Sequence, residues 1–155
     1  MTVLVSDEHP SSGVDPGHLR QLAEAVLLAE GFPPEAEVSI TLVEDDEMAA
    51  WNSRALGQPG PTDVLSFPVE KLLPGKVPDS VADGPPILIG DVVIAPDYVR
   101  RQADQYGVVA DDEIALMVAH GILHLLGYDH EEDVDAELME TRERDILAGE
   151  GRSRR

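Results

Sequence analysis

The sequence predicts one α+β domain over residues 1–150, a small mixed β-sheet packed with about five helices. Three observations favour this fold class. A chain of 155 residues with 43% hydrophobic residues is long enough to bury one core. Short alternating or β-branched segments are interspersed with longer amphipathic ones, which is typical of strands and helices. Proline and glycine separate most of these segments. Residues 151–155 are basic and are predicted to form a disordered tail.

Four segments have the composition of β-strands. They are residues 3–5, 37–43, 62–68 and 87–95. The second alternates polar and apolar residues, so we expect one face of it to be buried. The fourth is rich in β-branched residues, and we expect it to be buried on both faces around Gly90 and Asp91.

Five segments have the apolar spacing or the end signals of helices. They are residues 16–30, 45–56, 96–106, 112–126 and 131–148. Asp15 followed by Pro16 is a helix start, because the carboxylate caps free N–H groups and proline suits the first position. The acids of 131–145 are interpreted as a solvated helix face. The helix of 112–126 is almost wholly apolar after its acidic start, so we expect it to pack at the centre.

One long segment, residues 70–86, is rich in proline and glycine and shows no apolar periodicity. It is predicted to be a surface loop, either a mobile flap or an insertion.

Composition limits the classes of function. The formal net charge is −20, which opposes binding to free nucleic acid unless local positive groups, a metal or a basic protein partner help. The chain has no cysteine, so disulfides and thiolate metal sites are excluded. Neither a signal peptide nor a membrane-length apolar run is evident. We therefore expect a cytoplasmic protein with no membrane partner.

The strongest functional motif is a set of three histidines near the end of the apolar helix. His120 and His124 are one turn apart and project from the same helix face. Gly127 can stop the helix, and the turn would bring His130 back toward the first two. Three neutral imidazoles suit zinc or another borderline divalent metal, and leave a fourth position for water or substrate. The pattern predicts a catalytic metal site.

The histidine spacing matches the H-x-x-x-H-x-x-G-x-x-H frame of metzincin peptidases. The residue after the first histidine in that frame is the glutamate that acts as general base, and here it is Gly121. Glycine cannot accept a proton, so the sequence indicates a metallopeptidase-like metal helix but argues against ordinary metzincin proteolysis.

Three blocks in order resemble the bacterial YbeY family of endoribonucleases, also called rRNA maturation factors. The first joins Asn52-Ser53-Arg54 to Thr62–Pro68 (TDVLSFP), the second is Gly90–Ala95 (GDVVIA), and the third is His120–His130 (HGILHLLGYDH). The resemblance covers about residues 35 to 147. The long final helix and the tail are less typical of the family, and loop 70–86 is longer than its minimum.

The resemblance implies a metal-dependent endoribonuclease that cleaves single-stranded RNA. The family's nuclease activity is linked to maturation of the 3′ end of 16S rRNA and to ribosome quality control. Its three metal ligands correspond to His120, His124 and His130, and its functional arginine corresponds to Arg54. The expected cofactor is one Zn²⁺, with another divalent metal as the alternative. The expected partners are ribosomal RNA and the small ribosomal subunit with its basic proteins.

A chemical hypothesis follows for these residues. A metal lowers the pKa of bound water from 15.7 toward about 7 and neutralises charge on a phosphoryl oxygen. Arg54 would clamp the scissile phosphate bidentately, or else form a surface salt bridge. The general base stays open between the metal hydroxide and the side chains of Ser66, Asp129 and Glu131, and the RNA 2′-hydroxyl is an alternative nucleophile.

Two further acids have two interpretations each. Asp63 and Asp91 either orient the histidines from behind or cap strand edges. Tyr128 and Asp129 shape the turn.

Two other classes of function remain open from the sequence. One is a metallohydrolase of a different substrate, including a peptidase. The other is a non-catalytic ribosome-assembly factor whose metal is structural, which the charge of −20 favours.

Overall fold

A four-stranded mixed sheet forms the middle of the computed structural model, which describes all 155 residues. The strands are β1 (Thr2–Asp7), β2 (Ala36–Leu42), β3 (Val64–Pro68) and β4 (Ile87–Ile94). Their order across the sheet is β1-β2-β4-β3. β1, β2 and β4 run parallel, whereas β3 pairs with β4 antiparallel. The α+β fold and the mixed sheet predicted from the sequence are confirmed.

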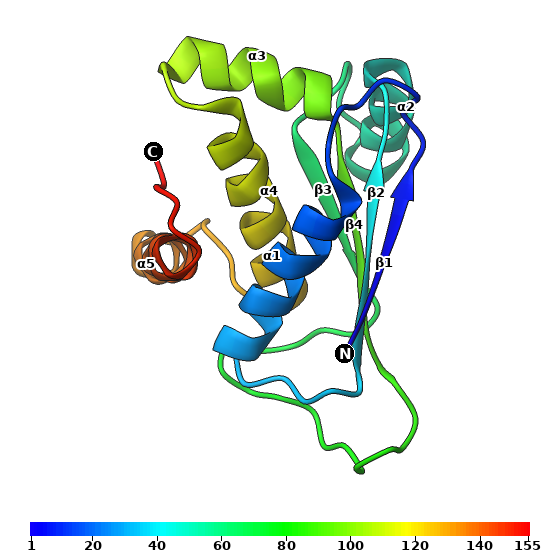
Figure 1. Ribbon diagram of the computed structural model, residues 1–155, viewed down its shortest axis with the longest axis vertical. Coiled ribbons are helices and arrows are strands. Elements are labelled where there is room, and N and C mark those ends of the chain that lie inside the picture. The colour runs from blue at the N-terminus through cyan, green and yellow to red at the C-terminus, as the bar shows by residue number, and fades with distance from the viewer.

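Five helices surround the sheet. They are α1 (Pro16–Ala29), α2 (Asp45–Leu56), α3 (Pro96–Tyr106), α4 (Ala110–Leu125) and α5 (Asp133–Gly149). Figure 1 shows α1 and α4 on one face of the sheet, with α5 beyond α4, while α2 lies on the other face near one end. No helix combines the length and the apolarity needed to cross a membrane.

The strand register separates the side chains into two faces. The inner face, toward α1 and α4, carries the row Val5, Ile40, Val92 and Ser66. The outer face carries the neighbouring row Leu4, Ser39, Asp91 and Phe67. Because successive strand residues point to opposite faces, adjacent residues of one motif fall in different layers.

Helix α4 is the centre of the main core. Eleven of its residues are buried, and it contacts α1, α3, α5 and both β3 and β4. Its apolar residues pack with those of α1 and the inner sheet face, including Leu22, Ile40 and Ile94. A helix apolar on most of its circumference needs such a position, because each exposed face would leave hydrophobic area in water. The predicted central position of this helix is confirmed.

The outer face is covered only at one end. There α2 places Met48 over Val43, Leu65 and Val93, and Trp51 packs against Phe67 with ring centroids 5.4 Å apart. Toward the other end, Leu88 and Asp91 of β4 are exposed. The prediction that β4 is buried on both faces around Gly90 and Asp91 is therefore wrong, because no helix covers this part of the outer face.

Helix α1 begins as the sequence predicted. The Asp15 carboxylate accepts a hydrogen bond from the Gly17 backbone N–H at 3.0 Å, and Pro16 occupies the first helical position. This cap compensates an N–H group that has no partner within the helix.

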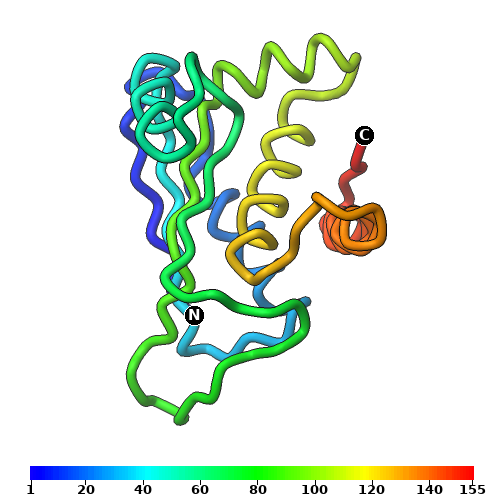
Figure 2. The backbone as a smooth tube through the Cα atoms, turned by 180° about the vertical axis from the view of Figure 1, so that it is seen from behind, coloured from blue at the N-terminus to red at the C-terminus, as the bar shows by residue number.

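The loop between β3 and β4 contains turns but no helix or strand over residues 70–86. Figure 2 shows it sweeping past the end of α4 before it returns to β4. Leu72 is partly buried against the main core, so the loop is anchored near its beginning.

The basic tail, residues 151–155, makes contacts that the sequence did not indicate. Arg152 pairs with Asp112 at 2.8 Å and Arg155 pairs with Glu113 at 2.9 Å, both on α4. The structure thus places the tail, which we expected to be disordered, against acids of the helices beside it.

Candidate metal centre

The three predicted histidines converge at the end of α4. One ligand nitrogen from each of His120, His124 and His130 lies within 4.8 Å of the other two. The Nε2 atoms of His120 and His124 are 3.1 Å apart. His120 and His124 are partly buried and His130 is exposed, so the cluster opens to solvent on one side.

Hydrogen bonds on the far side of two rings fix which nitrogen is free. His124 Nδ1 is 2.9 Å from the carbonyl oxygen of Tyr128, and His120 Nδ1 is 3.3 Å from Glu143 Oε2. Both partners accept, so the proton lies on Nδ1 in each ring. The Nε2 lone pairs are then turned toward each other, as metal-binding histidines with such supporting partners require.

Burial and charge favour the neutral form of His124. Removal from water lowers the pKa of this imidazole, and the neighbouring His120 lowers it further, against a smaller opposing effect of the Tyr128 hydrogen bond. A neutral imidazole is the form that binds a metal, because protonation would occupy the lone pair.

The donor set fits a zinc-like ion. Three nitrogens bound tetrahedrally at about 2.0–2.1 Å from zinc lie about 3.3 Å from one another. The Nε2 atoms of His120 and His124 are 3.1 Å apart, and all three ligand nitrogens lie within 4.8 Å of one another, which is close to this spacing. The three imidazoles would hold the metal and leave its remaining position facing the open side.

The turn after α4 depends on Gly127. Its φ of +101° is unfavourable for other residues, and a Cβ there would collide with the carbonyl oxygen of Leu72. The turn that returns His130 to the cluster is therefore packed directly against the loop of residues 70–86.

A cavity of about 370 Å³ adjoins His124, bounded on one side by this loop and on the other by the turn. Lys71 is the only cationic side chain among its lining residues, and Glu70 and Asp129 also line it. The loop thus forms one wall of a cavity beside His124, a role that its length and composition alone did not reveal.

Gly121 is explained by packing. A Cβ at this position would lie 2.7 Å from Val92 Cγ1 and 3.2 Å from Val64 Cγ2, so α4 approaches the sheet too closely for a side chain. Ser66 donates a hydrogen bond to the Gly121 carbonyl at 2.8 Å and ties β3 to α4. A glutamate base at this position would have to displace these valine side chains or the helix.

The three side chains considered as bases have different environments. The Ser66 hydroxyl is engaged by the Gly121 carbonyl. Asp129 accepts a hydrogen bond from the His130 backbone N–H at 2.7 Å and lines the cavity, and Glu131 is exposed. Among the three, Asp129 is the carboxylate in contact with the cavity.

Arg54 is in a different layer from the histidines. It lies on α2, is exposed, and stacks its guanidinium over Trp51 at 4.7 Å from the ring centroid. Its Nε donates to the Ala50 carbonyl at 3.4 Å, and it pairs with no carboxylate. The alternative of a surface salt bridge is therefore not what the structure shows, and no contact joins Arg54 to the histidines.

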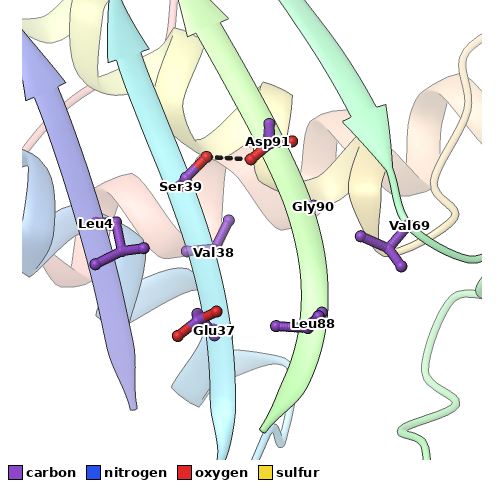
Figure 3. A pocket seen from close by; sticks show the side chains of 8 residues that line it. All are labelled: Leu4, Glu37, Val38, Ser39, Val69, Leu88, Gly90 and Asp91. Atoms are coloured by element: carbon purple, nitrogen blue, oxygen red, sulfur yellow. Dashed lines mark hydrogen bonds between the residues drawn. The ribbon is translucent and has the colours of Figure 1, made fainter.

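Asp63 and Asp91 do not orient the histidines. Asp63 accepts from the Val64 backbone N–H at 2.7 Å, a local cap at the start of β3. Asp91 accepts from the Ser39 hydroxyl on the outer sheet face, beside a second cavity of about 250 Å³ (Figure 3). The sheet lies between Asp91 and α4, which excludes direct contact with the histidines.

Glu143 is a candidate site residue that the sequence did not reveal. It was included in the solvated acidic face of the last helix, but its side chain is 1% exposed and contacts His120. A signal was available, because Met139, Glu143, Ile146 and Leu147 form one buried stripe with helical spacing. An acid within an apolar stripe indicates a buried partner.

An α+β domain with three converging histidines, two of them supported from behind by hydrogen bonds, defines a candidate metallohydrolase. Comparison with known proteins narrows the class. The family model described as "Endoribonuclease YbeY" matches residues 6–150. The chain belongs to this family, whose named activity makes it a family of RNA-cleaving hydrolases.

Individual relatives agree with the family model. A protein named Endoribonuclease YbeY from Frankia casuarinae is 44% identical over 97% of this chain and 76% of its own length. One from Thermobifida fusca is 44% identical over 99% of this chain and 96% of its own length. The solution structure of TM1509 from Thermotoga maritima matches with a TM-score of 0.61 and 27% identity, over 96% of this chain and 91% of that one.

Proposed function

We propose that the chain is a metal-dependent endoribonuclease that cleaves single-stranded RNA at the three-histidine site. Its substrate is ribosomal RNA, at the 3′ end of 16S rRNA, and it serves rRNA maturation and ribosome quality control in the cytoplasm. The observation that carries this proposal is the convergence of His120, His124 and His130 with two Nε2 atoms held free by partners behind them.

A bound Zn²⁺, or another divalent metal, would supply Lewis-acid stabilisation of the phosphate and a water of lowered pKa. The chain's own residues do the rest. The histidines would fix the position of the ion, while the turn and the loop of residues 70–86 bound the cavity beside His124. Asp129 lines this cavity and is the carboxylate that would accept a proton there.

Arg54 holds a substrate phosphate from the other side of β3. β3 is an edge strand, so groups of both sheet layers are accessible to an RNA strand laid along it. The guanidinium over Trp51 is free of carboxylates and offers a planar fork to a phosphate. In the free protein this arginine is a phosphate-binding group separate from the metal.

The charge of −20 makes local cations decisive. Lys71 lines the histidine cavity and, like Arg54, forms no salt bridge, so both are available to RNA phosphates. Over the rest of the surface, the negative charge would repel RNA phosphates and weaken binding to free RNA. This favours cleavage of RNA that is presented by the small ribosomal subunit and its basic proteins.

The test is cleavage of a single-stranded fragment of ribosomal RNA, with a duplex of the same sequence beside it. Cleavage of the single strand alone, lost in chelator and restored by Zn²⁺ or another divalent ion, supports the proposal. Cleavage that survives chelation contradicts metal dependence, and equal cleavage of both substrates contradicts single-strand specificity.

A second candidate is an assembly factor whose metal only stabilises the fold, which the acidic surface favours because it attracts basic ribosomal proteins. Stable association with small-subunit particles, without cleavage of free or particle-bound RNA, would favour it. A peptidase remains the weaker alternative because Gly121 provides no base, and a protease assay tests it directly.

A further inference from the structure

The basic tail, residues 151–155, contacts Glu143, the acid that supports the candidate metal ligand His120. Its arginines each face a carboxylate of α4 or α5: Arg152 faces Asp112, Arg155 faces Glu113, and Arg154 faces Glu140 and Glu143. Arg154 Nε is 3.6 Å from Glu143 Oε1, and Glu143 Oε2 is 3.3 Å from His120 Nδ1. A continuous polar connection therefore runs from the tail to a metal ligand.

Glu143 needs a counter-charge. Its side chain is 1% exposed, and its polar partners are His120 and Arg154 alone. A buried carboxylate is costly without a paired cation, and removing one partner of such a pair is strongly destabilising. A neutral His120 contributes one N–H, so Arg154 provides the charge that makes this position favourable for a carboxylate.

Arg154 is itself held at this place. Its side chain is 15% exposed, and its Nε is buried with no hydrogen-bond partner, while the Glu143 carboxylate lies 3.6 Å away. A buried donor without a bond costs free energy unless a nearby charge compensates. The guanidinium is therefore directed to the acid that supports His120 rather than to solvent.

We propose that the tail is a working part of the metal centre and that Arg154 is a positioning residue. Arg154 holds Glu143 in place, Glu143 holds the His120 ring with its proton on Nδ1, and His120 Nε2 is thereby presented to the metal. The inference rests on the proposed metal site, and adds that metal affinity depends on residues 151–155.

The same tail offers a matched control. Arg155 Nε lies 2.9 Å from Glu113, which is also 1% exposed, but the other partner of Glu113 is Gln102 and not a histidine. Arg155→Gln and Arg154→Gln each remove one contact between the tail and a buried glutamate. Only Arg154→Gln removes a contact to a glutamate that in turn contacts a candidate metal ligand, His120.

The experiment measures zinc affinity by competition with a chromophoric chelator, and the melting temperature of each metal-free protein. Glu143→Gln should weaken zinc binding roughly 10–100-fold, as loss of a partner behind a metal ligand typically does. Arg154→Gln should weaken it about fivefold, the lower end of coupling between sites. Arg154→Lys, which keeps the charge, should restore most of the affinity, and Arg155→Gln should leave it unchanged.

Zinc affinity that is unchanged in Arg154→Gln, or lowered equally in Arg155→Gln, would overturn the positioning role and leave the tail a structural strap. A wild-type protein that binds no zinc would overturn both this inference and the proposed function. Zinc binding that depends on Arg154 in a protein that cleaves no RNA would support the inference while removing the proposed function.

Discussion

The two faces of the sheet are formed by the same strands but have different roles in the structure. The inner face packs against α4 and fixes the helix that carries His120 and His124. The outer face is half covered by α2 and otherwise exposed, with Leu4, Ser39 and Asp91 in one row. Ser66 and Asp91, both in motifs shared with a nuclease family, fall on opposite faces.

This difference shows that two residues adjacent in a sequence motif need not lie close together in the folded site. Val92 limits how large residue 121 can be, while Asp91 beside it faces away from α4. Successive side chains of a strand point to opposite faces, so two adjacent residues of one motif belong to two different layers. We therefore expect substitutions on the two sides of the sheet to change different properties.

The largest expected effect is on cleavage, from Arg54→Glu on α2. This variant should bind the metal as the wild type does, because Arg54 contacts no histidine, and should lose most RNA cleavage because a phosphate now meets a carboxylate. Zinc affinity and cleavage rate are measured on the same preparation. The control is Arg20→Glu, the same charge change at an exposed arginine of α1.

A cleavage rate equal to wild type in Arg54→Glu would contradict the phosphate clamp. An equal loss in Arg20→Glu would assign the effect to net charge instead of to this side chain.

The next effect is on stability, from Gly121→Glu on the inner layer. The new side chain overlaps Val92 and Val64, so the free energy of unfolding should fall by about 1–3 kcal/mol or more. Gly121→Ala should cost less, since alanine gains about 1 kcal/mol in helix propensity. Urea unfolding measures both. A Gly121→Glu protein as stable as wild type would contradict the packing account of this glycine.

A smaller effect is expected on the pH dependence of stability, from His9, whose pKa is shifted in the opposite direction to that of His124. Burial lowers the pKa of His124, whereas the hydrogen bond from His9 Nε2 to Asp97 at 2.8 Å raises the pKa of His9. The same bond lowers the pKa of Asp97. His9 thus stabilises the fold when charged, and His124 serves its site when neutral.

The sign of this pH dependence follows from the two shifts. The His9 contribution is complete below its ordinary pKa of 6.5 and is lost as the pH rises through its raised value. The Asp97 contribution is present above its ordinary pKa of 3.8 and is lost as the pH falls through its lowered value. Asp97→Asn should therefore lower the melting temperature more near pH 5 than near pH 8. An equal loss at both pH values would show that the pair does not act through charge.

The smallest effect is expected on the exposed part of the outer face. Asp91→Asn keeps the shape of the side chain and an acceptor for the Ser39 hydroxyl. Zinc affinity and cleavage should both remain at wild-type values, because the sheet separates this residue from the histidines. A marked loss of zinc affinity would mean that influence passes through the sheet, and would remove the distinction between its faces.

Most of the fold could be predicted from the sequence, because the segments that form it carry strong local signals. Asp15 with Pro16 starts α1 where expected, and the apolar run before His120 is buried as expected. The three histidines were recognisable because their spacing on a helix and after a glycine is itself geometric. Local patterns therefore indicated both the elements and the three histidines that the structure brings together.

The rest depended on tertiary contacts that no local pattern contains. The side of the sheet on which Asp91 falls follows from pairing with β2 and from which face α2 covers. Glu143 is buried because α5 packs on α4. In the sequence it resembles the exposed acids around it, because it is charged as they are. The contacts of Arg154 join residues of the tail to α5, which charge counting alone treats as a solvated region.

The central claim is that RNA cleavage takes place at the three histidines. The most direct measurement is cleavage of a single-stranded ribosomal RNA fragment by metal-loaded wild type, His124→Ala and Asp91→Asn, each purified in the same way. We expect cleavage by wild type and Asp91→Asn, with loss of both metal and cleavage in His124→Ala. Equal cleavage by all three proteins, insensitive to chelator, would contradict it.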